Sequence, residues 1–233
     1  MALILNLETA TTVCSVSIAN DGHLLAFKEI NGDYSHAENL TLFIEEVMLQ
    51  AGKKLPDVDA VAVSKGPGSY TGLRIGVSTA KGLCYSLNKP LIAINTLSAL
   101  ANAQVWDYND KDSVPVLFCP MLDARRMEVY CAFFDAKNQE IKPTSAEIID
   151  EHSFSELLKK NVIYFFGDGA SKCKEVLSTN KNALFIDGIV PSALNMILLS
   201  EQAFVNKNFE DVAYFEPFYL KDFVAGKKKA KSF

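Results

Sequence analysis

The sequence has little of what metal-dependent or serine-nucleophile catalysis requires. Its histidines, His23, His36 and His152, are scattered and form no HxxxH or HExxH pair, the spacing by which one helix offers two ligands to zinc. No Gly-x-Ser-x-Gly motif is present, which argues against the nucleophile turn of the α/β-hydrolases. We therefore expect no metal ligands, no bound cofactor and no catalytic residues of these kinds.

Cysteine pairs and long apolar runs are also missing. The number of cysteines is odd, no two form a CxxC motif, and each lies in or beside an apolar run: Cys14, Cys84, Cys119, Cys131 and Cys173. This usage is typical of reduced, buried thiols in a cytoplasmic protein. No window reaches the ~18 uninterrupted apolar residues of a membrane span, and the first residues lack the basic segment of a signal peptide. We expect a cytoplasmic protein without membrane contact.

Positive charge is scarce outside the end of the chain. Residues 1–226 carry 19 basic and 28 acidic residues, a net charge of −9, whereas residues 227–233 carry four lysines and no acid. Phosphate contacts need clustered Lys and Arg, so the body is a poor nucleic-acid binder by itself. The basic tail has two interpretations, a solvated tail or a contact with RNA or an acidic partner. The apolar fraction of 49% is ample for a packed core.

Strands and helices are expected to alternate in two similar series. The first half predicts strands at 3–8, 13–19, 23–30, 60–63 and 90–94, and helices at 36–51, 71–87 and 96–104. The second half predicts strands at 114–122, 128–135, 140–149, 162–166 and 184–190, and helices at 153–160, 171–178 and 192–206. Ser35 is the expected N-cap of the first helix, and Thr96 that of the third.

The two halves resemble each other. Each opens with a strand that ends in an acid, Glu8 or Asp123, and continues through a hairpin into alternating helices and strands. This pattern predicts an α/β fold of two duplicated βββαβα lobes, arranged as in actin, Hsp70 and sugar kinases, with the second lobe reduced. We expect the first lobe at 1–105, the second at 106–226 and a basic tail at 227–233.

A glycine-rich segment at 65–76 is the most distinctive motif. It follows a strand and opens a helix, the geometry that presents free backbone N–H groups to an anion. No Gly-Lys-Ser/Thr closes it, and Thr71 stands where GxGxxG requires its third glycine. Two roles stay open: a phosphate site, or a tight turn whose glycines allow close packing.

Two helices carry unusual outward faces. The helix at 71–87 has an apolar stripe for the core, formed by Leu73, Val77, Ala80, Cys84 and Leu87. Its other side is small or apolar rather than charged: Ile75, Ser78, Thr79, Gly82 and Ser86. The helix at 36–51 points Leu42 and Leu49 away from its own core stripe, beside Glu45. Single exposed leucines are ordinary, but together these faces indicate a shared interface.

The acids at the strand ends have a functional and a local interpretation. Glu8 and Asp123 stand where an actin-like ATPase keeps metal-bridging acids, yet neither is followed by the turn that holds a γ-phosphate. They are better explained as acids that cap local turns. We expect the charges of Asp123-Ala124-Arg125-Arg126 to pair internally, and 167–170 to be a generic turn.

The motifs resemble those of the TsaB (YeaZ) family. The loop carries the resemblance most strongly, through Gly66, Gly68, Ser69, Tyr70, Thr71, Gly72 and Arg74; so do the opening 4–9, the run 123–130 and the closing Pro217-Phe218-Tyr219-Leu220. Two positions depart from the family pattern, with Glu8 in place of Asp and Lys221 in place of Arg.

The resemblance implies a role in making N6-threonylcarbamoyladenosine at position 37 of tRNA. It implies a non-catalytic scaffold or activator of TsaD, the relative that carries the metal and transfers the threonylcarbamoyl group. It further implies that the helices at 36–51 and 71–87 pair with TsaD, or with a second copy when the protein is alone. A TsaE-type ATPase joins the complex, and tRNA is contacted only indirectly. The alternative from the residues themselves is an autonomous ATPase or small-molecule kinase of actin-like fold.

Overall fold

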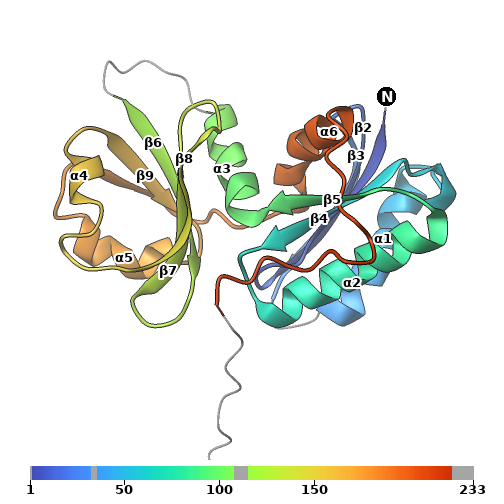
Figure 1. Cartoon of the computed structure of the whole chain (residues 1–233), viewed down its shortest axis with the longest axis horizontal. Helices are drawn as coiled ribbons and strands as arrows, with labels where there is room; N and C mark the ends of the chain where they lie inside the picture. The colour runs from blue at the N-terminus through green and yellow to red at the C-terminus, as the bar shows by residue number, and fades with distance from the viewer. Residues whose placement is uncertain (1, 33–35, 108–114, 222–233) are drawn as a thin grey trace, which may run out of the picture.

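The computed structural model describes residues 2–32, 36–107 and 115–221, which form two lobes (Figure 1). The first lobe holds β1 (Leu3–Glu8), β2 (Val13–Asn20), β3 (His23–Asn31), α1 (His36–Gln50), the 3-10 turn η1 (Leu55–Asp57), β4 (Ala60–Gly66), α2 (Tyr70–Leu87), β5 (Leu91–Asn95) and α3 (Thr96–Asp107). The second series runs β6 (Val116–Asp123), β7 (Glu128–Phe134), β8 (Glu140–Ile148), α4 (Ser155–Leu158), β9 (Val162–Phe166), α5 (Ala170–Leu177), β10 (Ala183–Ile186), the 3-10 turn η2 (Ala193–Met196) and α6 (Ile197–Val205).

The two sheets match strand for strand. The first has the order β3-β2-β1-β4-β5 and the second β8-β7-β6-β9-β10. In each sheet the first three strands are antiparallel neighbours and the later two add in parallel. The predicted duplication is therefore confirmed. The reduction of the second lobe lies in its helices, because α4 and α5 have 4 and 8 residues where α1 and α2 have 15 and 18.

Both faces of the first sheet are covered. Leu3, Leu5 and Leu7 of β1 point to one face, where they pack with α1 and α2, and Ala2 and Ile4 point to the other. Successive strand residues alternate between faces, so a central strand covered on both sides is apolar throughout. The predicted core stripe of α2 is buried except Leu87, which is half-buried near the helix end.

The last helix of each series packs against the sheet of the other lobe. Helix α3 follows β5 but packs its Leu97 and Leu100 against Phe118 and Phe134 of the second sheet. The η2–α6 segment follows β10 but packs its Met196 on the first sheet, on the face opposite α1 and α2 (Figure 1). The lobes are thus joined by an exchange of helices.

The C-terminal part of the chain also lies on the first lobe, although the sequence places it in the second. Residues 206–221, the C-terminal strap, run along the edge of the first sheet, where the Glu210 N–H donates to the Leu91 carbonyl at 2.9 Å. Farther on, the Phe218 N–H donates to the Lys65 carbonyl at 2.7 Å. The strap covers the β5 edge, which would otherwise leave backbone groups unpaired.

Several local predictions need correction. Asn95, not Thr96, caps α3, because its Oδ1 accepts from the N–H groups of Leu97 and Ser98. The single helix expected at 192–206 is broken into η2 and α6. Its start is pinned to β2, since the Ala193 N–H donates to Ser15 Oγ and its carbonyl accepts from Ser17 Oγ. The proposed cap Ser35 lies outside the described residues.

Two predictions about cysteines and membranes can be checked within these ranges. The five cysteines are free and buried, as expected. Among the described helices, none combines the length and apolar character that crossing a membrane requires.

Candidate functional site

The glycine loop packs against its own chain. A Cβ placed on Gly68 would lie 2.3 Å from the Ala10 carbonyl oxygen, and one on Gly72 would lie 2.1 Å from that of Thr9. The same test puts Gly66 against the Phe218 carbonyl and Gly76 against Thr9 Oγ1. Real side chains do not approach so closely, so these positions require glycine. Of the two roles left open by the sequence, close packing accounts for all four.

Hydrogen bonds hold the loop to the turn after β1. The Ser69 N–H donates to the Ala10 carbonyl at 2.6 Å, and Thr9 Oγ1 donates to the Gly72 carbonyl at 2.8 Å. Ser69 itself caps α2, where its hydroxyl accepts from the Gly72 N–H at 3.3 Å. The loop residues therefore serve first to join α2 to the first strand.

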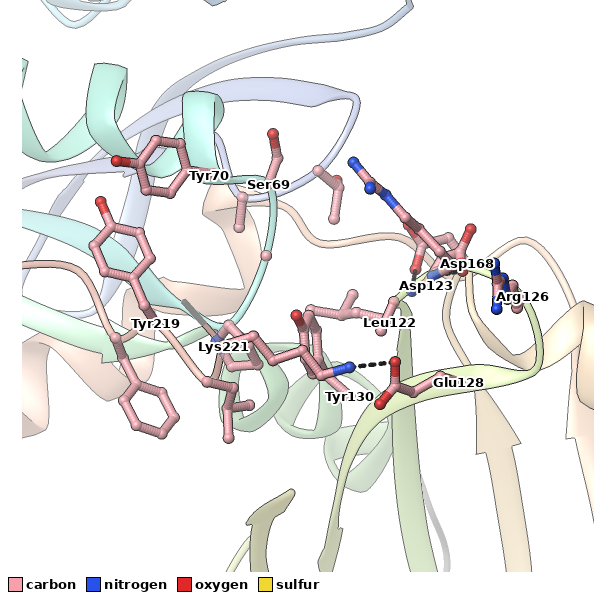
Figure 2. Close-up of a pocket in the computed structure, with 18 of the residues that line it drawn as sticks. Ser69, Tyr70, Leu122, Asp123, Arg126, Glu128, Tyr130, Asp168, Tyr219 and Lys221 are labelled. Carbon is pink, nitrogen blue, oxygen red and sulfur yellow. Dashed lines mark hydrogen bonds and ion pairs between the residues drawn. The ribbon is translucent and has the colours of Figure 1, made fainter. Parts of the chain in front are cut away.

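A cavity of about 1100 Å³ lies between the lobes beside this loop (Figure 2). The first lobe contributes the turn 10–12 and the loop 67–71, the second contributes 122–128, Tyr130, Ile148 and Asp168, and the strap contributes 218–221. It lies at the carboxyl ends of β1, β4 and β6, where ligands of α/β sheets commonly bind. Its wall includes Tyr70 and Tyr219, whose ring centres are 5.0 Å apart.

The two strand-end acids differ in their surroundings. Glu8 is fully buried and does not line the cavity. Burial raises the pKa of Glu8 to about 7, although its carboxylate accepts from the Ala10 N–H at 2.6 Å and from Ser64 Oγ at 2.8 Å. The structure does not bring Glu8 and Asp123 together in one open site. Glu8 instead holds the turn on which the glycine loop packs.

Asp123 lines the cavity and is ion-paired with Lys172. Partial burial tends to raise the pKa of Asp123, but the hydrogen bonds from Lys172 and the Arg125 N–H lower it overall. The predicted internal pairing of 123–126 is wrong for the arginine side chains, since the carboxylate takes Lys172 and only the backbone N–H of Arg125. Glu128 forms a second ion pair, with Lys221 of the strap (Figure 2).

The predicted interface residues occupy one continuous part of the first lobe. On α1, Leu42 and Leu49 are 53% and 82% exposed, and Glu45 is exposed beside them. On the neighbouring α2, Ser78, Gly82 and Ser86 are exposed, while Ile75 and Thr79 are half-buried. A Cβ on Gly82 would meet nothing within 4 Å. We call this surface the α1–α2 face; among the described residues nothing covers its leucines.

The sequence analysis did not identify two exposed tyrosines near the α1–α2 face. Tyr85 of α2 is 85% exposed, and its spacing of seven residues from Ser78 was the available clue. Tyr214 of the strap is 84% exposed and lies beside α2, since Lys81 Nζ donates to the Ala213 and Phe215 carbonyls at 3.2 and 2.9 Å. Both extend the apolar margin of the α1–α2 face.

Metal-binding groups are not assembled in the part of the chain that the structure describes. No three or more His, Cys, Asp or Glu side chains there are grouped so that they could hold an ion.

Comparison with known proteins assigns the family. The model of the family described as TsaD, tRNA N6-adenosine threonylcarbamoyltransferase, matches residues 32–228. The tRNA threonylcarbamoyladenosine biosynthesis protein TsaB of Escherichia coli is 31% identical over 232 residues, 97% of this chain and 97% of that protein. The chain belongs to the TsaB family. It also falls within the wider family that the TsaD model describes, which confirms the resemblance found in the motifs.

Solved structures agree on the fold. A Pseudomonas aeruginosa protein described as similar to the peptidase YeaZ superposes with a TM-score of 0.77 at 22% identity, over 95% of this chain and 100% of that one. The inorganic polyphosphate/ATP-glucomannokinase of Arthrobacter sp. strain KM superposes with a TM-score of 0.50 at 12% identity, over 88% and 100%. This TsaB-family chain therefore has the actin-like fold of such kinases.

Proposed function

We propose that this chain is a non-catalytic scaffold or activator of a TsaD-type transferase in the formation of N6-threonylcarbamoyladenosine at position 37 of tRNA. Its curated relatives are named as biosynthesis proteins of this modification. The observation that carries the proposal is the α1–α2 face, where two exposed leucines of α1 stand beside a row of small residues on α2. Such a surface favours another helix pair as its partner.

The partner is the TsaD-type transferase, and the same face pairs two copies when the chain is alone. Both halves of such a pair share one fold, because the TsaD family model also describes this chain. A TsaE-type ATPase completes the cytoplasmic complex. The body of the chain, at net −9, repels phosphates, so the rest of the complex supplies most of the tRNA affinity at physiological salt.

We propose that the chain is not a catalyst because neither strand-end acid is available to a substrate. Glu8 is buried away from the cavity, and Asp123 is neutralised by Lys172. The alternative, an autonomous ATPase or small-molecule kinase, needs the glycine loop free for phosphates, whereas its glycines are packed on Thr9 and Ala10. Calorimetry with Mg-ATP on the full chain decides between them: micromolar binding, with turnover lost in Glu8→Ala, would replace the scaffold proposal.

The partner surface is tested by Leu42→Glu with Leu49→Glu. Both leucines are exposed in the monomer, so the fold should be unaffected. Burying each leucine against a partner contributes roughly 1.5–3 kcal/mol, and a buried unpaired carboxylate reverses that gain. We expect the double variant to lose co-elution with its TsaD-type transferase while keeping its circular dichroism spectrum.

The matched control is Ile141→Glu with Val205→Glu. These side chains are 54% and 69% exposed on β8 and α6, away from the α1–α2 face. The control should co-elute like the wild type. Undiminished co-elution of the Leu42 and Leu49 variant would remove the assignment of this face.

A further inference from the structure

Two of the chain's three arginines line the interlobe cavity, and the third stacks on a ring of its wall. The chain has 23 basic residues, and the other twenty are lysines. Arg125 and Arg126 line the cavity, and the Arg74 guanidinium lies 4.6 Å from the ring centre of Tyr70, which lines it too. Arginine binds phosphate through two parallel hydrogen bonds and stacks on flat rings, which lysine does not. We propose that the rim of this cavity, at Arg125 and Arg126, binds the phosphodiester backbone of RNA.

The charges around the cavity leave these two guanidiniums available. Of the three acids that line the cavity, Asp123 and Glu128 are ion-paired with Lys172 and Lys221, and Asp168 Oδ1 accepts from the Asp123 N–H. Arg125 and Arg126 are exposed, and neither forms an ion pair with any residue that the structure describes. A charged group without an ion-pair partner among the described residues can bind an external phosphate.

The turn that carries the arginines is held in place. Both residues have left-handed backbones, with φ of 74° and 49°, a conformation that non-glycine residues adopt at a cost. The Arg125 N–H donates to Asp123 Oδ1 at 2.9 Å, and the Glu128 N–H donates to the Arg125 carbonyl at 3.1 Å. These bonds fix where both side chains leave the backbone, which lowers the entropy lost on binding.

The opposite wall carries two aromatic rings. Tyr70 and Tyr219 are half-buried and lie side by side on this wall, with their ring centres 5.0 Å apart (Figure 2). Proteins bind single-stranded RNA and RNA loops through such a combination of aromatic rings and arginine. The rings distinguish RNA from an acidic peptide, which would use the cations alone.

The inference rests on the proposed function, which supplies tRNA as the RNA, and adds a direct contact to it. The test titrates the full chain into a fluorescein-labelled RNA stem-loop with a seven-nucleotide loop and follows anisotropy between about 25 and 200 mM salt. Arg125→Ala with Arg126→Ala should weaken binding about tenfold at the lowest salt. It should also reduce the slope of log K against log salt by about 1.5, the value for two lost phosphate contacts.

The control removes two exposed lysines of the same lobe, Lys160→Ala with Lys181→Ala, and should change neither quantity. Urea midpoints confirm that both double variants are folded. The inference is overturned if the wild type shows no saturable binding, or if both double variants bind equally. It is also overturned if a labelled polyglutamate peptide binds as tightly with the same dependence on arginine. The co-elution assay of the partner surface changes Leu42 and Leu49 instead. A negative RNA-binding result would therefore leave the scaffold proposal standing.

Discussion

Glu8 is a buried carboxyl whose protonation is linked to folding. Burial raises the pKa of Glu8 from 4.5 to about 7 in the folded chain. Between these values the folded state keeps a proton that the unfolded state has lost, so the free energy of unfolding falls as pH rises from about 4.5 to 7. A shift of this size corresponds to about 3 kcal/mol. Glu8 thus favours the folded state most at low pH.

We expect Glu8→Gln to remove this pH dependence. The amide stays neutral and its oxygen still accepts from Ala10 and Ser64, as Glu8 Oε1 does. Urea unfolding at pH 5, 6 and 8 should show a decline for the wild type and a flatter profile for Glu8→Gln, with the variant more stable at pH 8. Glu175→Gln, which changes an exposed acid of α5, should keep the wild-type decline. Parallel profiles for Glu8→Gln and the wild type would mean that Glu8 is ionised in the folded chain.

For single residues, the sequence predicts well which side chains face solvent and which face the core. It predicts poorly which distant residues a side chain contacts. Leu42, Leu49 and Ser78 are exposed as their helical spacing indicates. The partner of Asp123 was missed because Lys172 lies 49 residues away. No local pattern reports which distant side chain meets a carboxylate in the folded chain.

Helix α2 uses its glycines in two ways. Gly72 in its first turn packs on the Thr9 carbonyl, whereas the position of Gly82 faces open space. We expect Gly72→Ala to destabilise the fold by about 3 kcal/mol through overpacking against backbone. Gly82→Ala should stabilise it by about 0.5–1 kcal/mol, because alanine is the better helix former. Urea midpoints measure both.

The same pair of variants tests the α1–α2 face. If a partner helix approaches closely at Gly82, Gly82→Ala should weaken co-elution with the transferase even though the monomer is more stable. Wild-type co-elution by Gly82→Ala would restrict the contact to the leucines. A destabilised Gly82→Ala would contradict the open space seen around this position.

Elements were predictable where the pattern is local. Strands β1 to β5 lie within about three residues of the ranges that alternation and turns predict. The split of η2 from α6 was not predictable, because the start of η2 is held by hydrogen bonds between Ala193 and two serines 176 and 178 residues earlier. Apolar spacing in that stretch fits one helix equally well.

The stability of the first lobe depends on the exchange of α3 and α6 between the lobes. Without η2 and α6, Ala2, Ile4 and Ile92 on one face of the first sheet would meet water. We expect residues 1–107 alone to show no cooperative urea transition. Residues 1–95 joined by a Gly-Ser linker to 190–221 should regain one, because the missing cover and strap are restored. A cooperative transition of 1–107 at the midpoint of the joined chain would contradict this dependence.

The duplication itself was predictable, and the exchange was not. Strand, acid and hairpin recur in order at Glu8 and Asp123, so two lobes follow from the sequence. Helices α3 and α6 each follow a parallel strand, and their apolar residues do not say which sheet they cover. Which sheet each helix covers is seen only in the packing of Leu97 on Phe118 and of Met196 on Ile4.

The exchange of helices has a consequence for synthesis on the ribosome. The first sheet is complete once β5 ends at Asn95, but the helix that covers its second face ends at Val205. At about 5–20 residues per second, most of that face stays uncovered for several seconds or more while the second lobe is made. During this interval the nascent chain exposes an apolar sheet surface, which is the kind of surface that chaperones bind.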